Sequence, residues 1–567
     1  MKRSKPALLE AVAILLLSGN AWAATYHVAQ TTGASDANPG TATSPMLTIQ
    51  AGVNKAQAGD TVLIHTGTYR ESVKAANSGT AQAGILISTA GDGEVTLSGA
   101  DVVPASQWVG VPGSQPIWQH TPWTYQGVTH PSDQPLVGRT EQVIADGNLL
   151  QQVLVMNQMT AGTFYADPVT AKALYIWLTA GDSPASHTIE TSLRKSLLSL
   201  TGSYIVVSGL HFIYGTNPAQ SSVLDVEGSN NVAQDCIVEW TNGCGAGLGG
   251  SNNTMLRLIS RFNGQQGLGS SQSTQNLMED CTLQGNNVKG FPTGWEAGGM
   301  KVSGSRQFHI LRCLAIQNNG NGFWWDVDDQ DGVIEQSYAA DNLSGIMVEI
   351  SENITVQNNL CIRNGLTDTS GANWGDAGIK LGEAMSCTVQ HNVTVNNRTG
   401  IEVRQQGVRT VTNAPGKEFY SDALVFDQNI SAFNTVWQWA LYGDNGFWGG
   451  SGSPLSEPDL DLLNPDLRHW KSTGDLYYPT GSGEGLILWG AGWRPNHVVY
   501  SDLPTFLAAH NLEQGSLESD PLFLNWQAGN FDLSPASPAI GIGSGFTEQP
   551  VLPGQTTAKS GRQPRRP

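Results

Sequence analysis

The chain has 567 residues, of which 66 are glycine and only 14% are charged, and its formal net charge is −19. This composition favours a turn-rich β protein with many backbone-paired residues. So acidic a chain argues against nucleic acid and anionic membranes as partners, because both repel negative charge. It also disfavours strongly anionic polysaccharides as substrates, unless a local basic cleft overrides the net charge.

The first 23 residues have the pattern of a secretory signal peptide. Residues 2–5 supply three basic side chains, residues 11–17 form an apolar run, and residues 21–23 (Ala-Trp-Ala) form a small-residue cleavage site. The apolar run is too short to span a bilayer, and no later stretch is long and apolar enough to do so. We therefore expect a secreted or periplasmic protein without a membrane span.

Residues 24–100 are expected to form an N-terminal cap and the first coils of a solenoid. The runs 33–41 (GASDANPGT), 48–50 (TIQ) and 67–71 (GTYRE) resemble the entry cap of pectate-lyase-like right-handed β-helices. The resemblance implies an all-β, right-handed parallel β-helix with an N-terminal capping helix at about 49–56. Such a helix covers strand edges and core side chains that a solenoid end leaves exposed.

Residues 101–200 interrupt the alternation of apolar and polar residues that marks the first coils at 83–100. They include three tryptophans and several short apolar runs, which predict a β-rich insertion. Two roles remain open for it: it walls a groove, or it braces the N-terminal half of the solenoid.

The segment 201–442 carries a repeat that predicts the central parallel β-helix with the active site. One column of dipeptides recurs as Asp235-Cys236, Asp280-Cys281, Arg312-Cys313, Gln336-Ser337, Asn358-Asn359, His391-Asn392 and Gln428-Asn429. Five residues later an asparagine recurs as Asn286, Asn318, Asn342, Asn364, Asn397 and Asn434. Asparagine at a turn bonds neighbouring backbone and tolerates left-handed geometry. The column also places its cysteines in a buried stack of small side chains rather than in disulfides.

The repeat is lost in 443–555, which we expect to hold C-terminal coils and an exit segment. Residues 520–523 (DPLF), 529–533 (GNFDL) and 537–540 (SPAI) resemble the exit segment of the same superfamily. The basic, proline-rich residues 556–567 predict a disordered tail.

A second alignment, on the glycines at 299, 322, 345, 378 and 400, identifies the strand that carries chemistry. Positions one and three after each glycine are apolar and point inward, so positions two and four point outward. The outward columns are Lys301, Trp324, Met347, Lys380, Glu402 and Ser303, Asp326, Glu349, Gly382, Arg404, and Asp328 extends the outward set. Crowded like charges beside an exposed tryptophan indicate a site, because a merely solvated face avoids such repulsion.

Asp326 and Glu349 are 23 residues apart, which is about one coil of a solenoid. They therefore lie on neighbouring parallel strands, about 4.8 Å apart in backbone spacing. Two carboxyl groups separated by about 5–5.5 Å suit a retaining glycosidase. One carboxylate also raises the pKa of the other, which helps the second hold a proton near neutral pH.

The run Trp324-Trp325-Asp326, with Glu349 one coil later, is similar to the parallel β-helix β-xylosidases and related glycoside hydrolases. The resemblance implies that Asp326 is the nucleophile and Glu349 the acid/base in hydrolysis of a poly- or oligosaccharide, without a cofactor or metal. Xylose specificity does not follow, because residues 350–353 (ISEN) depart from the xylosidase pattern. Lys301, Trp324, Asp328, Lys380, Glu402 and Arg404 would bind substrate, although the charged members serve equally well as structural salt bridges.

Two other functions remain open from the sequence. A polysaccharide lyase or uronate epimerase would use Lys301 or Lys380 as base. It would hold Ca²⁺ with Asp326, Asp328, Asp329 and Glu349, since Ca²⁺ takes several oxygen ligands. A non-catalytic glycan-binding protein would bind the same sugars without turnover.

Overall fold

The computed structural model describes residues 23–113, 115–124, 138–167, 170–367, 376–443, 464, 467–481, 485–490 and 498–543. The expected signal peptide, apart from residue 23, and the tail expected to be disordered lie outside these residues. None of the helices in the described part of the chain is long and apolar enough to cross a membrane.

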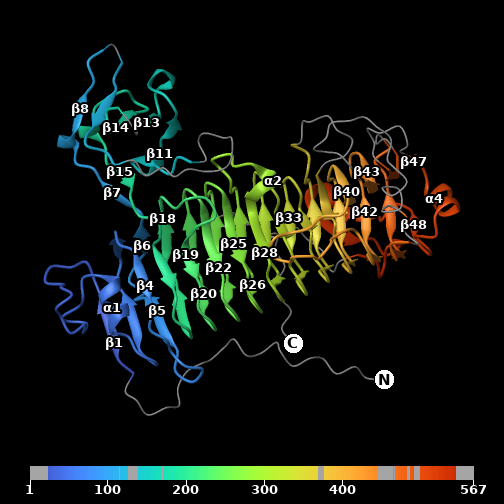
Figure 1. Cartoon of the computed structure of the whole chain (residues 1–567), viewed down its shortest axis with the longest axis horizontal. Helices are drawn as coiled ribbons and strands as arrows, with labels where there is room; N and C mark the ends of the chain where they lie inside the picture. Colours follow the sequence, from blue (N-terminus) through green and yellow to red (C-terminus); the bar gives the residue numbers. More distant parts are fainter. Residues whose placement is uncertain are drawn as a thin grey trace.

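Three sheets of 13 strands each wind side by side along one solenoid (Figure 1). Sheet 1 has the order β1 (Thr25–Val28), β2 (Thr61–Ile64), β5 (Ile85–Thr89), β17 (Ile205–Ser208), β20 (Val232–Gln234), β23 (Thr254–Leu256), β26 (Leu277–Glu279), β29 (His309–Leu311), β32 (Val333–Glu335), β35 (Thr355–Gln357), β38 (Thr388–Gln390), β41 (Val425–Asp427) and β44 (Lys471–Thr473).

Sheet 2 has the order β4 (Val73–Ala75), β16 (Leu198–Leu200), β19 (Ser222–Val226), β22 (Cys244–Leu248), β25 (Gln266–Ser271), β28 (Gly298–Ser303), β31 (Phe323–Asp326), β34 (Ile346–Glu349), β37 (Ala377–Gly382), β40 (Thr399–Gln405), β43 (Trp437–Gly443), β46 (Ile487–Trp489) and β47 (Val498–Tyr500). Its strands pair in parallel except for the last pair, β46 and β47, which is antiparallel.

Sheet 3 has the order β3 (Gly67–Tyr69), β6 (Val95–Ser98), β18 (His211–Ile213), β21 (Ile237–Glu239), β24 (Ile259–Arg261), β27 (Thr282–Gln284), β30 (Leu314–Ile316), β33 (Tyr338–Ala340), β36 (Leu360–Ile362), β39 (Val393–Val395), β42 (Ile430–Ala432), β45 (Leu476–Tyr478) and β48 (Leu517–Glu518). The predicted all-β, right-handed parallel β-helix is confirmed.

The predicted capping helix is α1 (Ile49–Lys55), at the N-terminal end of the solenoid (Figure 1). The Thr48 hydroxyl accepts the N–H of Ala51, and the Glu71 carboxylate accepts two further N–H groups of the first turn. A Cβ on Gly52 would lie 2.9 Å from the side chains of Val28 and Val62. Glycine is a poor helix former, and it stands here because the helix lies so close to the first coil.

The β-rich insertion forms two small sheets of its own (Figure 1). One contains β7 (Ala100–Val102), β10 (Val143–Ala145), β11 (Asn148–Leu149) and β15 (Ile189–Ser192), and the other contains β8 (Trp108–Gly110), β9 (Trp118–His120), β12 (Gln151–Val153), β13 (Thr163–Asp167) and β14 (Ala173–Trp177). An ion pair between Arg70 and Glu190 at 2.6 Å joins the insertion to the first coils, and one between Arg194 and Asp101 at 2.8 Å joins its two ends.

The remaining elements are short. They are α2 (Thr293–Glu296), α4 (Leu503–Ala509), the hairpin strands β49 (Phe523–Asn525) and β50 (Asn530–Leu533), and single 3-10 turns at Ala105–Gln107, Met156–Gln158, Pro184–Ser186 and Trp526–Ala528. The sequence did not reveal α4. Its Phe506 is fully buried, with its ring centroid 5.8 Å from that of Trp439. The helix therefore covers core aromatics near the C-terminal end, as α1 does at the other end.

The predicted asparagine column is a continuous hydrogen-bonded ladder. The N–H of Asn318 donates to Oδ1 of Asn342 at 3.1 Å, and that of Asn342 donates to Oδ1 of Asn364 at 3.1 Å. The left-handed residue is the one before each asparagine, such as Gln317 (φ 56°) or Asp341 (φ 58°), and not the asparagine itself. The asparagine contributes its side chain to the ladder, so its expected backbone geometry was wrong.

The expectation of unpaired cysteines is confirmed. All six cysteines are buried and none forms a disulfide. The thiol of Cys313 accepts the N–H of Cys281 at 3.4 Å, and the column continues through Ser337 and Asn359 with N–H donations at 3.0 Å. Small polar side chains in this column therefore accept backbone N–H groups of the preceding coil.

Replacing one ladder asparagine should destabilise the fold strongly. Asn342→Ala removes the acceptor of both the N–H and the side-chain amide of buried Asn318. Each buried donor left without a partner costs about 1–3 kcal/mol, so we expect a loss of about 2–5 kcal/mol in the free energy of unfolding, measured by denaturant titration. The control Asn54→Ala, on the exposed side of α1, should change it by less than about 0.5 kcal/mol. Equal effects of the two substitutions would contradict the ladder's role.

Candidate active site

The outward face of sheet 2 carries the two side-chain columns expected from the sequence. Phe323, Trp325, Ile346 and Val348 are fully buried in the solenoid core, as the alternation requires. The register pairs Ser303 with Asp326 and Glu349 with Gly382. The columns therefore lie in consecutive coils, one strand after another.

The structure brings Asp326 and Glu349 together. β31 and β34 pair with the 23-residue offset that also separates these two carboxyl groups. Asp326 is 6% exposed, and its Oδ2 lies 2.8 Å from the ammonium of Lys301. Its Oδ1 is buried and has no hydrogen-bond partner. One oxygen of Asp326 is thus held by a cation while the other is left free.

Glu349 is partly exposed and paired with a residue that the sequence did not point to. Nη1 of Arg409 lies 2.7 Å from Glu349 and 3.5 Å from Glu383, which is fully buried. Glu383 follows the aligned strand directly, where alternation would turn it inward. Its left-handed backbone (φ 47°) breaks the alternation and brings its carboxyl group to Arg409.

Burial raises the pKa of Asp326 to about 6, and the negative charge of Glu349 adds to this shift, while Lys301 opposes it. Burial likewise raises the pKa of Glu383 to about 7, although a hydrogen bond from the N–H of Gln406 works in the opposite direction. Lys301 and Arg409 lower the pKa of Asp326, and Arg409 and Arg404 lower that of Glu383, but burial outweighs these cations at both groups. Burial thus favours the protonated forms of Asp326 and Glu383 relative to exposed carboxyl groups.

The expectation that Trp324 is exposed for sugar stacking was wrong. Its side chain is 2% exposed. The ammonium of Lys301 lies 4.0 Å from the ring centroid, in a cation–π contact. The same ammonium also donates to the carbonyl oxygen of Trp295 at 2.8 Å. The Trp324 ring and the carbonyl oxygen of Trp295 therefore position the ammonium of Lys301 beside Asp326.

Asp328 does not continue the outward column. Val327 and Asp328 both adopt left-handed backbone, with φ of 63° and 69°, which ends the strand alternation. Asp328 is 3% exposed and accepts charged hydrogen bonds from Arg306 at 2.6 Å and Lys417 at 2.9 Å. Burial alone would raise its pKa, but hydrogen bonds from Lys417, Gln330 and Arg306 outweigh burial and lower the pKa. Asp328 is a structural ion-pair partner.

Lys380 and Glu402 were expected to face substrate, but both are buried, at 5% and 0% exposure. Their charged groups lie 3.4 Å apart, and Lys380 is also 3.7 Å from Asp376. Burial of opposite charges beside each other favours a structural pair over an open binding surface. Arg404 is partly exposed and lies opposite Gly382, in the same column as Glu349.

The segment 406–420 crosses back over the preceding coils and supplies two cations of this region, Arg409 and Lys417. An antiparallel bridge between Arg409 and Phe419 forms its base. The side-chain amide of Asn413 donates to the carbonyl oxygen of Val327 at 2.6 Å, and Lys417 binds both Asp328 and Glu352. The segment carries no repeat signal, so the sequence alone did not connect it to the site.

The acidic residues considered as Ca²⁺ ligands do not converge. Asp329 accepts the N–H groups of Ser305 and Asp326, whereas Asp328 is directed to Arg306 and Lys417. Within the described ranges, no three His, Cys, Asp or Glu side chains are placed to hold a metal ion.

The buried charge of Asp326 should reduce stability at high pH. Its folded pKa, about 6, exceeds the ordinary value of 3.8, so the folded state loses stability as pH rises from about 4 to about 6 and stays lower above that. Relative to wild type, Asp326→Asn should gain about 2–3 kcal/mol between pH 4 and pH 7.5 in denaturant titrations. The control Asp328→Asn, at a carboxyl group whose pKa is lowered, should be less stable than wild type at both values. A pH-independent difference for Asp326→Asn would contradict the raised pKa.

Comparisons with known proteins agree with this fold. A family model described as a right-handed β-helix region matches residues 222–392, less than half of the chain. No curated protein matches the chain by sequence.

Solved structures resemble the chain at low sequence identity. The structure of XylC with xylose is 15% identical, with a TM-score of 0.57, and the match covers 83% of this chain and 87% of that one. A GH136 lacto-N-biosidase from Eubacterium ramulus is 12% identical, with a TM-score of 0.41 over 88% of this chain and 68% of that one. A PL6 family polysaccharide lyase from Pseudopedobacter saltans is 12% identical, with a TM-score of 0.42 over 88% and 94%. The predicted likeness to pectate-lyase-like right-handed parallel β-helices is thus confirmed at the level of the fold.

Proposed function

We propose that the chain is an exported carbohydrate-active enzyme, a retaining glycoside hydrolase that acts on a poly- or oligosaccharide. The observation that carries the proposal is the carboxyl pair Asp326 and Glu349 on adjacent parallel strands, each held by its own cation. A backbone spacing of about 4.8 Å suits the carboxyl separation of about 5–5.5 Å that retaining enzymes use, and not the wider inverting separation. The likeness to XylC, solved with xylose, agrees with a sugar ligand.

The surroundings of the two carboxyl groups assign Asp326 the role of nucleophile and Glu349 the role of acid/base. Asp326, with Lys301 on one oxygen and a free second oxygen, attacks the anomeric carbon while the glycosidic bond breaks. Glu349 is the more exposed and gives its proton to the departing glycosidic oxygen. Glu349 then takes a proton from water, which displaces Asp326 from the anomeric carbon and restores both groups.

Glu383 and Arg409 lie next to Glu349. Nη1 of Arg409 lies 2.7 Å from Glu349 and 3.5 Å from Glu383, and burial raises the pKa of Glu383 to about 7. Glu383 and Arg409 are therefore positioning residues that hold the side chain of Glu349.

The charges of the lysines favour hydrolysis over a lyase or epimerase reaction. A lyase base must be free to accept a proton from carbon. Lys301 is bound by Asp326 at 2.8 Å, and Lys380 lies 3.4 Å from Glu402. Each ammonium group is thus engaged by a carboxylate, so neither lysine is free to act as a base.

Substitution of the two carboxyl groups should separate their roles. On aryl glycosides with poor leaving groups, Glu349→Gln should lower kcat/KM by about 10²–10⁴, and good leaving groups should restore much of the loss. Asp326→Asn should lose about 10³ or more with both kinds of leaving group. Glu335→Gln, on sheet 1 of the same coil, is the control and should leave activity unchanged.

A 2-fluoro glycoside should trap a covalent sugar on Asp326, seen by peptide mass spectrometry. Sugar on Glu349 would reverse the two roles. Unsaturated uronate products would establish the lyase alternative instead, and turnover surviving both substitutions would place the site elsewhere.

The fall of kcat/KM at low pH should reflect protonation of Asp326. Because the nucleophile must be ionised, kcat/KM on an aryl glycoside should fall as pH drops below about 6. Lys301 lowers the pKa of Asp326, so Lys301→Met should move this fall to higher pH as well as slow the reaction. A slower variant whose kcat/KM falls at the same pH would contradict the assignment of Lys301 as the partner of the nucleophile.

A further inference from the structure

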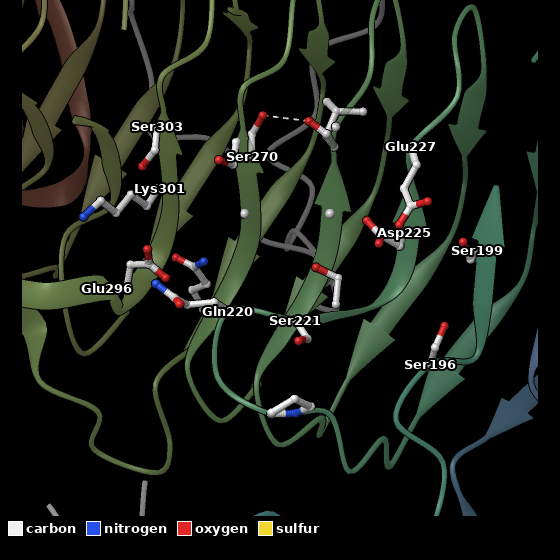
Figure 2. A pocket seen from close by; sticks show the side chains of 18 of the residues that line it. Ser196, Ser199, Gln220, Ser221, Asp225, Glu227, Ser270, Glu296, Lys301 and Ser303 are labelled. Atoms are coloured by element: carbon white, nitrogen blue, oxygen red, sulfur yellow. Dashed lines mark hydrogen bonds between the residues drawn. The ribbon is translucent and has the colours of Figure 1, made fainter. Parts of the chain in front are cut away.

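A cavity of about 740 Å³ opens on the outward face of sheet 2, N-terminal to the carboxyl pair (Figure 2). Strands β16, β19, β22, β25 and β28 form its floor, and of the predicted insertion 101–200 only Lys195, Ser196 and Ser199, in or just before β16, line it. Figure 2 shows Asp225 and Glu227 near one end, and Gln220, Glu296 and Lys301 at the other. Lys301, the partner of Asp326, therefore belongs to both regions.

The strand register links the cavity to the candidate active site. Asp225 pairs with Gly247, Gly247 with Gly269, and Gly269 with Lys301. Three strand spacings of about 4.8 Å put Asp225 roughly 14 Å from Lys301 along the solenoid. A glycan chain running along the solenoid axis from Asp326 would thus pass over this cavity.

Between Asp225 and Lys301, the outward positions are glycines, Gly247 and Gly269, which have no side chain to fill the cavity. A Cβ on Gly247 would collide with Oδ1 of Asp225 and lie 2.8 Å from Oγ of Ser222. A Cβ on Gly269 would lie 3.0 Å from the side-chain amide of Gln266. Glycine at these positions leaves space for polar side chains of neighbouring strands to lie over the floor.

The carboxyl groups of the cavity form no direct ion pairs in the described part of the chain, although Lys195 and Lys301 also line it and the charge of Lys301 opposes the raised pKa of Glu296. Among the described residues, Asp225, Glu227 and Glu296 form no ion pair within 4.0 Å, in contrast to most carboxyl groups of the candidate active site. Burial raises the pKa of Asp225 to about 7, and the hydrogen bond and charge of Glu227 add to the shift. Two adjacent carboxyl groups favour a cation between them, because the cation relieves their mutual repulsion.

A buried acceptor beside them also lacks a partner. Gln266 is 3% exposed and lines the cavity. Its side-chain N–H group donates to the sulfur of Cys244 at 3.1 Å, but its Oε1 has no hydrogen-bond partner. A buried acceptor left without a donor is costly, so a ligand that brings N–H or O–H donors satisfies it.

We propose that this cavity binds a sugar residue bearing a protonated amino group, which is held between Asp225 and Glu227 with Gln266 as a further acceptor on the cavity wall. The proposal rests on the proposed function, since it makes the cavity a distal part of the glycan-binding surface. An ammonium group relieves the repulsion between Asp225 and Glu227, whereas a uronate in the same place would add a third negative charge. The substrate is then a glycan with an amino sugar some residues from the bond that is cleaved.

The test compares three β-1,4-linked tetramers that differ only at C2: glucosamine, N-acetylglucosamine and glucose. Isothermal titration calorimetry should show that wild type binds the amine-bearing tetramer at least roughly tenfold more tightly than the other two. The double variant Asp225→Asn, Glu227→Gln should lose this preference, and Glu335→Gln should retain it. Equal affinities for the three tetramers, or a preference that survives the double variant, would overturn the proposal.

If the double variant fails to fold, Glu227→Gln alone carries the test, because Glu227 is exposed. Binding and hydrolysis are scored separately on the same preparations. Selective binding of the amine tetramer without hydrolysis of any glycan would refute only the hydrolase proposal. Hydrolysis that depends on Asp326, together with equal affinities for the tetramers, would refute only the amino-sugar proposal.

Discussion

The in-register stacking of coils is the constraint on which the rest of the structure depends. Each coil is short and leaves its backbone to be paired by the coils on either side. The asparagine ladder fixes this register, because each side chain accepts an N–H of the preceding coil and donates to other ladder or backbone groups. A slip of one residue would turn the outward face inward, so the ladders hold the core and the chemical face in place together.

Stacking of the coils also places like charges next to each other in the candidate site. Like charges in one column repel, and the pair Asp326 and Glu349 cannot be separated without changing the register. The chain offsets the repulsion with Lys301 from the neighbouring coil and Arg409 from the segment 406–420. Because burial outweighs these cations, the pKa of Asp326 remains raised, which costs stability.

The same face behaves differently toward its N-terminal side. There, glycines replace the bulky outward residues, and Asp225 and Glu227 form no ion pair among the described residues. Around Asp326 and Glu349, the outward face is covered by side chains and its carboxyl groups form ion pairs. Over β16 to β28, the same face is open as a cavity. This contrast favours a ligand that is held over the cavity and reacts at its edge.

The sequence by itself determined the coils, the capping helix, the unpaired cysteines and the pairing of Asp326 with Glu349. These features depend on spacing along the chain, and in a solenoid spacing translates directly into stacking. It did not reveal that Trp324, Lys380 and Glu402 are buried, because alternation gives the direction of a side chain and not what covers it. Only the tertiary structure brought Arg409, Glu383 and Lys417 to the carboxyl groups. Their positions depend on left-handed residues that end a strand and on a non-repeating segment that folds back over earlier coils.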